Sequence, residues 1–159
     1  MPFIDHWIPH PAGRLHVRDW PGPDAAGAPP LVLVHDSLGC VELWRDFPAR
    51  LRQATGRRVI AYDRAGFGRS DARSGPPSHD FIAEEATTWF PLLRAPLGLE
   101  RFALLRHSVG GGMAVTLAAR HRAACTALVT LAAQAFVEPR PLDGLARPSV
   151  VSGTRVDLG

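Results

Sequence analysis

Short apolar runs alternate with longer stretches of helical composition through most of this chain. Four runs are bounded by polar residues and are too short for helices, which is typical of strands buried on both faces; they span residues 31–34, 58–62, 102–105 and 126–131. Helical composition or spacing follows at residues 42–54, 80–94 and from residue 112 onward. Apolar strands that alternate with helices predict an α/β fold, a mostly parallel sheet with helices on both faces.

The two ends of the chain depart from this alternation. Residues 3–8 and 14–19 alternate between apolar and polar side chains, which predicts an antiparallel hairpin at an edge of the sheet. Residues 20–30 contain four prolines and two glycines and predict an irregular surface loop. We expect one core over residues 1–135, followed over residues 136–159 by an irregular tail with at most one short strand.

A serine lies in the sharp turn between the third of the four apolar runs and the helix after it. The segment His107-Ser108-Val109-Gly110 must redirect the chain there, and the glycines after the serine let the backbone approach closely without a Cβ collision. A serine in this place presents its hydroxyl at the carboxyl end of the sheet, beside the positive end of a helix dipole. Two other runs also end in glycine-containing turns, His35-Asp36-Ser37-Leu38-Gly39 and Asp63-Arg64-Ala65-Gly66-Phe67-Gly68-Arg69-Ser70.

These three turns, in this order, resemble those of the α/β-hydrolase superfamily over roughly residues 12–135. The family carries a His-Gly-x-x-Gly-like turn, in which Asp36 here replaces the second-position glycine. It often carries Asp-x-x-Gly-x-Gly-x-Ser after the next strand, and the segment from Asp63 to Ser70 matches every fixed position. Its nucleophile turn reads Gly-x-Ser-x-Gly, and Arg106 replaces the first glycine. The resemblance implies the fold of the first part of such a hydrolase, incomplete at its C-terminus.

The resemblance also implies roles for individual residues. Ser108 would be the nucleophile, and the backbone N–H groups of Val109 and Ser37 would form the oxyanion hole that stabilises the alkoxide of an acyl-transfer intermediate. The alternative is that Ser108 is only a helix N-cap, a common role for serine. Asp63 is expected to tie its tight loop through hydrogen bonds from the carboxylate to backbone groups.

The catalytic base is the missing part of this pattern. A serine nucleophile needs a histidine, itself oriented by a carboxylate, and in this superfamily the order is serine, acid, histidine. After Ser108 the only histidine is His121, which lies far along the next helix. We expect His107 to point away from Ser108 and His35 to organise its own loop. Asp157 is the candidate acid, and the chain resembles a hydrolase that ends before its lid and catalytic histidine.

Composition narrows the classes of function that remain. The formal net charge of +3 and the pI of about 9.6 come from 18 arginines with no lysine. These arginines are scattered rather than clustered, which disfavours a nucleic-acid groove. Cys40 and Cys125 have no metal-like spacing and are expected to be buried free thiols. No secretory signal and no run of membrane-spanning length is visible, so we expect a cytoplasmic protein without a membrane segment, metal or cofactor.

The sequence therefore predicts a serine hydrolase that acts on a small carboxylic ester or related acyl compound. The alternative is a non-catalytic α/β domain in which Arg106 occupies the site near the serine and holds an anion or a partner. A phosphate or dinucleotide site on Gly110-Gly111-Gly112 is less well supported, because Gly-x-Gly-x-x-Gly is absent. The strand at 126–131 is expected to lie at an uncovered edge, which favours dimers or aggregates.

Overall fold

One mixed sheet forms the centre of the structure, a computed structural model that describes residues 2–22, 28–36, 38–73, 75, 78–107 and 111–131. Within these residues the sheet has six strands in the order β1-β2-β4-β3-β5-β6. Their bounds are β1 (Ile4–His10), β2 (Gly13–Trp20), β3 (Leu31–Val34), β4 (Val59–Tyr62), β5 (Phe102–His107) and β6 (Cys125–Leu131). Every strand predicted within residues 1–135 is present, with ends that differ by at most two residues.

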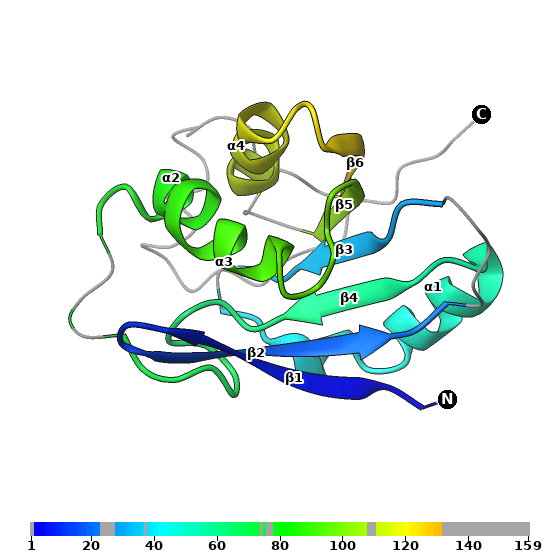
Figure 1. Cartoon of the computed structure of the whole chain (residues 1–159), viewed down its shortest axis with the longest axis horizontal. Coiled ribbons are helices and arrows are strands. Elements are labelled where there is room, and N and C mark those ends of the chain that lie inside the picture. Colours follow the sequence, from blue (N-terminus) through cyan, green and yellow to red (C-terminus); the bar gives the residue numbers. More distant parts are fainter. Residues whose placement is uncertain are drawn as a thin grey trace, which may run out of the picture.

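The first two strands form the predicted hairpin at one side of the sheet. β1 runs antiparallel to β2, from Ile4 opposite Asp19 to His10 opposite Gly13. β2 is also antiparallel to β4, whereas β4, β3, β5 and β6 are parallel to their neighbours. Figure 1 shows the hairpin extending the parallel part of the sheet on the side away from β6. The mostly parallel sheet is thereby confirmed.

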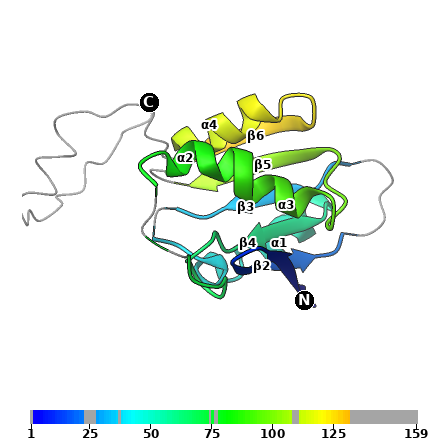
Figure 2. The same ribbon diagram turned by 60° about the vertical axis from the view of Figure 1, so that its left-hand side comes forward.

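Helices cover both faces of this sheet (Figures 1 and 2). On one face lie α2 (Phe81–Glu84), the π-helical turn η2 (Glu85–Trp89), α3 (Phe90–Arg94) and α4 (Gly111–Arg120). The other face carries the 3-10 turn η1 (Val41–Trp44) and α1 (Phe47–Thr55). This is the two-sided arrangement that the alternation of strands and helices predicts.

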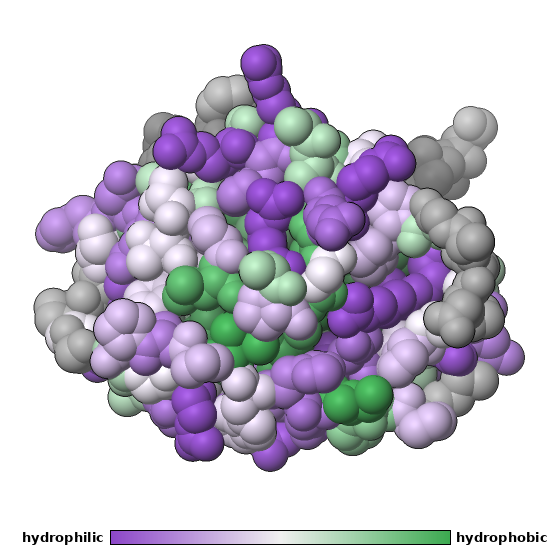
Figure 3. Space-filling view, viewed as in Figure 1, coloured by the Kyte–Doolittle hydropathy of each residue, from purple (hydrophilic) through white to green (hydrophobic). Residues whose placement is uncertain are grey.

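Alternating residues of each central strand supply two separate apolar layers. Val32 and Leu104 pack with α2–α3 and α4, and Phe90 meets Phe102 edge-on with 5.0 Å between ring centroids. Leu33 and the other odd-numbered residues of these strands pack instead against η1 and α1. Figure 3 shows polar side chains over most of one face of the molecule, with apolar side chains gathered near its middle. Burial of strands on both faces explains why they read as unbroken apolar runs.

Residues 42–54 are helical as predicted, in two separate elements, the 3-10 turn η1 and the nine-residue helix α1. Arg45 ends η1 with φ of 51°, and α1 begins only at Phe47. Asp46 occupies the N-cap position but makes no side-chain cap among the described residues; its carboxylate accepts a 2.6 Å hydrogen bond from Arg50 instead. Gly56, with φ of 65°, ends α1 in the left-handed conformation that glycine accepts most easily.

Four further expectations concern the helix at 80–94, the two cysteines, the last strand and the tail. Residues 80–94 are helical as predicted, but a π-helical turn interrupts the α-helix at Glu85–Trp89. Cys40 and Cys125 are free cysteines as predicted, yet both are half-exposed rather than buried. β6 pairs with β5 alone within the described residues and is largely solvent-exposed; self-association through it stays a prediction. The tail at 136–159 lies outside the described residues.

Arg45 is the one non-glycine residue of the described chain with positive φ, and its side chain is exposed. Such a conformation costs a non-glycine residue on the order of 1–3 kcal/mol. We expect Arg45→Gly to raise the free energy of unfolding by about 1 kcal/mol in urea titrations, after the entropic cost of glycine is subtracted. The matched control is Arg50→Gly inside α1, which should destabilise by about 1 kcal/mol. A loss of stability in both variants would show that Arg45 is not strained.

Candidate functional site

The structure brings the ends of the strands that lead into the three glycine-containing turns to one edge of the sheet. Val34 at the end of β3 is paired with Tyr62 at the end of β4 on one side, and with Arg106 of β5 on the other. The turns that begin at His35, at Asp63 and after His107 therefore leave neighbouring strands side by side. At the carboxyl edge of an open α/β sheet, residues from several strands can act on one ligand.

Asp63 is the hydrogen-bonding centre of this edge. Its side chain is fully buried, and its Oδ1 accepts a 2.6 Å hydrogen bond from the backbone N–H of Val41, where η1 starts. Its Oδ2 accepts from the backbone N–H of Arg69 at 3.0 Å. A Cβ on Gly68 would lie 2.3 Å from the Asp63 carboxyl carbon, so only glycine fits there. The loop-tying role predicted for Asp63 is confirmed.

A second layer of contacts connects Asp63 to the hairpin. His16 is fully buried in β2, with Nδ1 2.7 Å from Asp63 Oδ2 and Nε2 3.1 Å from Asp5 Oδ1. The Ser70 hydroxyl donates to the Asp63 carbonyl at 2.6 Å and accepts from the His16 N–H at 2.9 Å. Arg18 donates to Asp5 at 2.8 Å. The histidine is thus enclosed by two carboxylates, and the Asp63 loop is fixed to β2.

These contacts change the pKa of both carboxyls. Burial alone raises the pKa of Asp63, but hydrogen bonds from His16 and from the backbone N–H groups of Arg69 and Val41 outweigh it, so this pKa lies below its usual value. The hydrogen bond from Arg18 is the largest cause of the strongly lowered pKa of Asp5, with burial opposing it and His16 assisting. Both carboxylates are therefore ionised at neutral pH.

His35 is held as a neutral ring within its own turn. Nδ1–H donates to the Asp36 carbonyl at 2.7 Å, and Nε2 accepts the backbone N–H of Arg64 at 3.1 Å. Burial, assisted by the charge of Arg64, lowers the pKa of His35 to about 4. These two hydrogen bonds make His35 a link between the β3 and β4 turns. Since Nε2 must stay unprotonated to accept the Arg64 N–H, the ring cannot take a proton at neutral pH. This agrees with its expected organising role.

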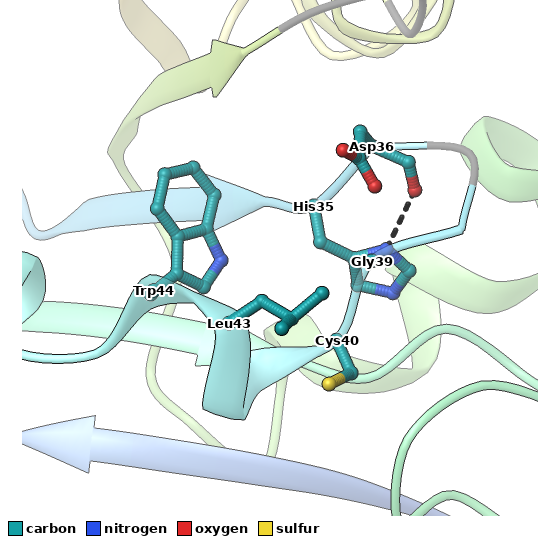
Figure 4. A pocket seen from close by; sticks show the side chains of 6 residues that line it. All are labelled: His35, Asp36, Gly39, Cys40, Leu43 and Trp44. Atoms are coloured by element: carbon teal, nitrogen blue, oxygen red, sulfur yellow. Dashed lines mark hydrogen bonds between the residues drawn. The ribbon is translucent and has the colours of Figure 1, made fainter.

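A small pocket opens beside the His35 turn (Figure 4). It has a volume of about 110 Å³, and its lining residues come from the end of β3 and from η1: His35, Asp36, Gly39, Cys40, Leu43 and Trp44. Two of its buried polar atoms, Asp36 Oδ1 and Trp44 Nε1, have no hydrogen-bond partner among the described residues. Both atoms have almost no solvent-accessible surface, so neither faces the open space of the pocket.

Arg106 is almost entirely buried at the end of β5. Its side chain is 1% exposed, and its Nε and Nη1 have no hydrogen-bond partner within the described part of the chain. Burial lowers its pKa to about 10, so the guanidinium stays charged at neutral pH. Nearby, the Tyr62 hydroxyl donates to Glu85 at 2.7 Å, and burial raises the pKa of both groups. The elbow glycine of the family pattern is thus replaced by a buried positive charge.

His121 lies just beyond the C-terminal end of α4, a ten-residue helix whose length is about 15 Å. Its Nε2 lies 3.0 Å from the Ala86 carbonyl, and its ring packs on Phe90 with centroids 5.3 Å apart. Burial lowers its pKa. The ring therefore serves the packing of α4 on the neighbouring helices.

The four predicted site residues, Ser37, Ser108, Val109 and Asp157, lie outside the described residues, and so does the side chain of His107. Sequence reasoning missed His16, Glu85, Tyr62 and Trp44. A histidine in the alternating pattern of β2 gives no local signal of burial. The sign that could have pointed to Glu85 is an acid that faces the sheet side of its helix.

The described residues contain no group of three or more histidine, cysteine or acidic side chains placed to hold a metal ion. No helix in the same part of the chain combines the length and apolar character needed to cross a membrane.

Comparison with known proteins gives consistent matches. A family model described as alpha/beta hydrolase fold matches residues 29–156. The chain is 33% identical over 123 residues to the 1-acylglycerol-3-phosphate O-acyltransferase ABHD5 of Homo sapiens, covering 75% of this chain and 34% of that protein. It is 37% identical over 90 residues to the proline iminopeptidase of Lactobacillus helveticus, covering 55% of this chain and 29% of that protein.

The solved structure of carboxylesterase CesB from Bacillus subtilis superposes with a TM-score of 0.68 at 25% identity, covering 92% of this chain and 50% of that one. The chain spans about a third of the length of the curated relatives it matches.

The ionised Asp63 carboxylate should make the free energy of unfolding depend on pH in the acid range. Because the pKa values of Asp63 and Asp5 are lower in the folded state, their contribution is complete above the unfolded pKa of about 4 and is lost as the pH falls through the folded values. We expect Asp63→Asn to lower the free energy of unfolding at pH 7 by about 3 kcal/mol and to flatten its fall below pH 4.

Urea titrations across this pH range measure both effects. The control is Asp46→Asn, which removes an exposed pair with Arg50 and should change stability by less than about 1 kcal/mol. An Asp63→Asn variant as stable and as acid-sensitive as the parent would contradict the account.

Proposed function

Because the chain belongs to the alpha/beta hydrolase fold family, we propose that it is a serine hydrolase acting on a small carboxylic ester or related acyl compound. The observation that carries the proposal is that β4, β3 and β5, the strands that lead into the three turns, are adjacent and parallel. The names of the relatives, an O-acyltransferase, a carboxylesterase and an iminopeptidase, support acyl chemistry of this kind.

In this proposal Ser108 attacks the carbonyl carbon of the substrate. It follows β5 in sequence and precedes α4, which starts at Gly111, so the positive end of the helix dipole is close to the place where an oxyanion forms. The backbone N–H groups of Val109 and Ser37 would donate to that oxyanion. The hydrogen bonds of His35 support this arrangement, because they fix the β3 turn that contains Ser37 against the β4 turn.

The proton of Ser108 needs an acceptor. His35 has both ring nitrogens engaged within the β3 and β4 turns, and His121 packs beyond the far end of α4. We therefore propose that the base comes from outside the described residues, with Asp157 as the candidate for the acid that orients it.

Labelling with a fluorophosphonate probe tests the nucleophile. We expect the parent chain to be labelled and to hydrolyse p-nitrophenyl acetate, and Ser108→Ala to lose both. The control is Ser78→Ala, which removes an exposed hydroxyl and should leave labelling unchanged. A folded parent chain that takes no label, or a Ser108→Ala variant labelled as fast as the parent, would overturn the proposal.

Arg106 favours one alternative, a non-catalytic domain that binds an anion near the nucleophile turn. A buried guanidinium whose Nε and Nη1 find no partner among the described residues is costly, and an anion that accepts from both would lower that cost. The charges of Arg64 and Glu85 also act on Arg106, in opposite senses.

For this alternative we expect inorganic phosphate to raise the melting temperature of the parent chain, because a ligand that binds only the folded state stabilises it. Arg106→Met, which keeps the length of the side chain without its charge, should remove the phosphate effect. Arg101→Met, at an exposed position just before β5, should retain it. An equal response of all three proteins would exclude an anion site at Arg106.

A further inference from the structure

The pocket beside the β3 turn is bounded mainly by apolar atoms. Both ring nitrogens of His35 are engaged in hydrogen bonds, and Asp36 Oδ1 and Trp44 Nε1 are covered, so none of these polar atoms is offered to the open space. Figure 4 shows the Leu43 side chain extending from η1 toward the β3 turn, between Trp44 and Cys40. Such a lining suits an uncharged alkyl group.

The segment that forms the pocket also exposes two leucines. Leu38 in the β3 turn is 88% exposed and Leu43 in η1 is 64% exposed, the two highest values among the large apolar side chains of the described residues. Leu43 lines the pocket, and Leu38 comes directly before the lining residue Gly39. Apolar surface left in water beside a pocket is typical of a binding site, because a ligand that covers it removes it from water.

The walls of the pocket are held in place without a ligand. Trp44 stacks on Phe47 with 5.6 Å between ring centroids, and both rings pack against the apolar layer beneath η1. η1 starts at Val41, whose N–H donates to Asp63 at 2.6 Å. On the side of the β3 turn, His35 joins that turn to β4. A preformed pocket of this kind loses little conformational entropy when a ligand binds.

Volume and position define the ligand. A cavity of about 150 Å³ accommodates the six carbon atoms of benzene, so a pocket of about 110 Å³ takes about four. Two lining residues, Asp36 and Gly39, stand on either side of Ser37 in the sequence, and consecutive Cα atoms are about 3.8 Å apart. The N–H of Ser37, the proposed oxyanion donor, therefore belongs to the turn that lines the pocket. An ester whose carbonyl oxygen accepts from that N–H has its acyl chain within reach of the pocket.

We propose that this pocket binds the unbranched acyl chain of a short-chain ester or related acyl compound, with about four carbon atoms beyond the carbonyl. Leu43 on the exposed side and Trp44 on the packed side then determine which chain length is preferred. The assignment of the alkyl group to the acyl chain of a substrate rests on the proposed function, whereas binding of an uncharged alkyl group does not.

A series of straight-chain alcohols tests the binding. Full burial of one methylene changes affinity about fourfold, and the pocket is open on one side, so we expect the dissociation constant to fall about two- to fourfold per methylene from ethanol to 1-butanol. From 1-pentanol to 1-hexanol it should change less than about 1.5-fold, because the last carbons stay in water. Titrations followed by NMR on the backbone amides of Gly39 and Cys40, which line the pocket, give these constants.

A variant assigns the preference to the pocket. Leu43→Ala removes one wall at an exposed position and should reduce the change per methylene to less than about 1.5-fold. Ile4→Ala is the matched control, because Ile4 is 51% exposed on β1 and does not line the pocket; it should bind the series like the parent. With p-nitrophenyl esters, kcat/KM should rise from acetate to pentanoate and then level, and this rise should be smaller in Leu43→Ala.

An affinity for alcohols that does not depend on chain length, one that keeps rising at the same rate to 1-hexanol, or a Leu43→Ala variant that behaves like the parent would each overturn the inference. Fluorophosphonate labelling separates it from the proposed function. Labelling of Ser108 with a flat alcohol or ester series would leave the hydrolase and remove this subsite. Chain-length-dependent binding of alcohols that is lost in Leu43→Ala, without labelling, would support the pocket and remove the hydrolase.

Discussion

The buried carboxylate of Asp63 is the constraint on which the rest of this structure depends. It fixes three segments that are distant in sequence: His16 of β2, the start of η1 at Val41 and the loop at Arg69. A buried charge is tolerated only where every lone pair is satisfied, so these segments must meet in one geometry. The hairpin, the 3-10 turn and the β4 loop are thereby held as a unit at the carboxyl edge of the sheet.

That unit also determines what this edge can do. The hydrogen bond to Val41 positions η1 and with it Trp44, while His35 connects the β3 and β4 turns through a ring that stays neutral. The β3 turn is thus preorganised next to the end of β5, as an oxyanion site requires. Arg106 departs from the family pattern, because it places a buried positive charge where that pattern has glycine.

Much of the fold could be predicted from the sequence, because strands buried on both faces read as unbroken apolar runs and the motif turns mark their ends. The loop role of Asp63 followed from its spacing to Gly66 and Gly68. The positive φ of Arg45 could not be predicted, since arginine does not signal that conformation. The contact of His16 with Asp63 joins residues 47 positions apart, and no local pattern reports it. The predicted nucleophile and oxyanion groups stay predictions.

The most direct test of the central claim is a crystal structure of the chain after reaction with a fluorophosphonate. The account predicts phosphorus bonded to Ser108 Oγ, with the phosphonyl oxygen about 3 Å from the backbone nitrogens of Ser37 and Val109. It also predicts that the β3 turn is still joined to β4 through His35. An adduct on another residue, or one on Ser108 whose phosphonyl oxygen points away from these two nitrogens, would contradict the account.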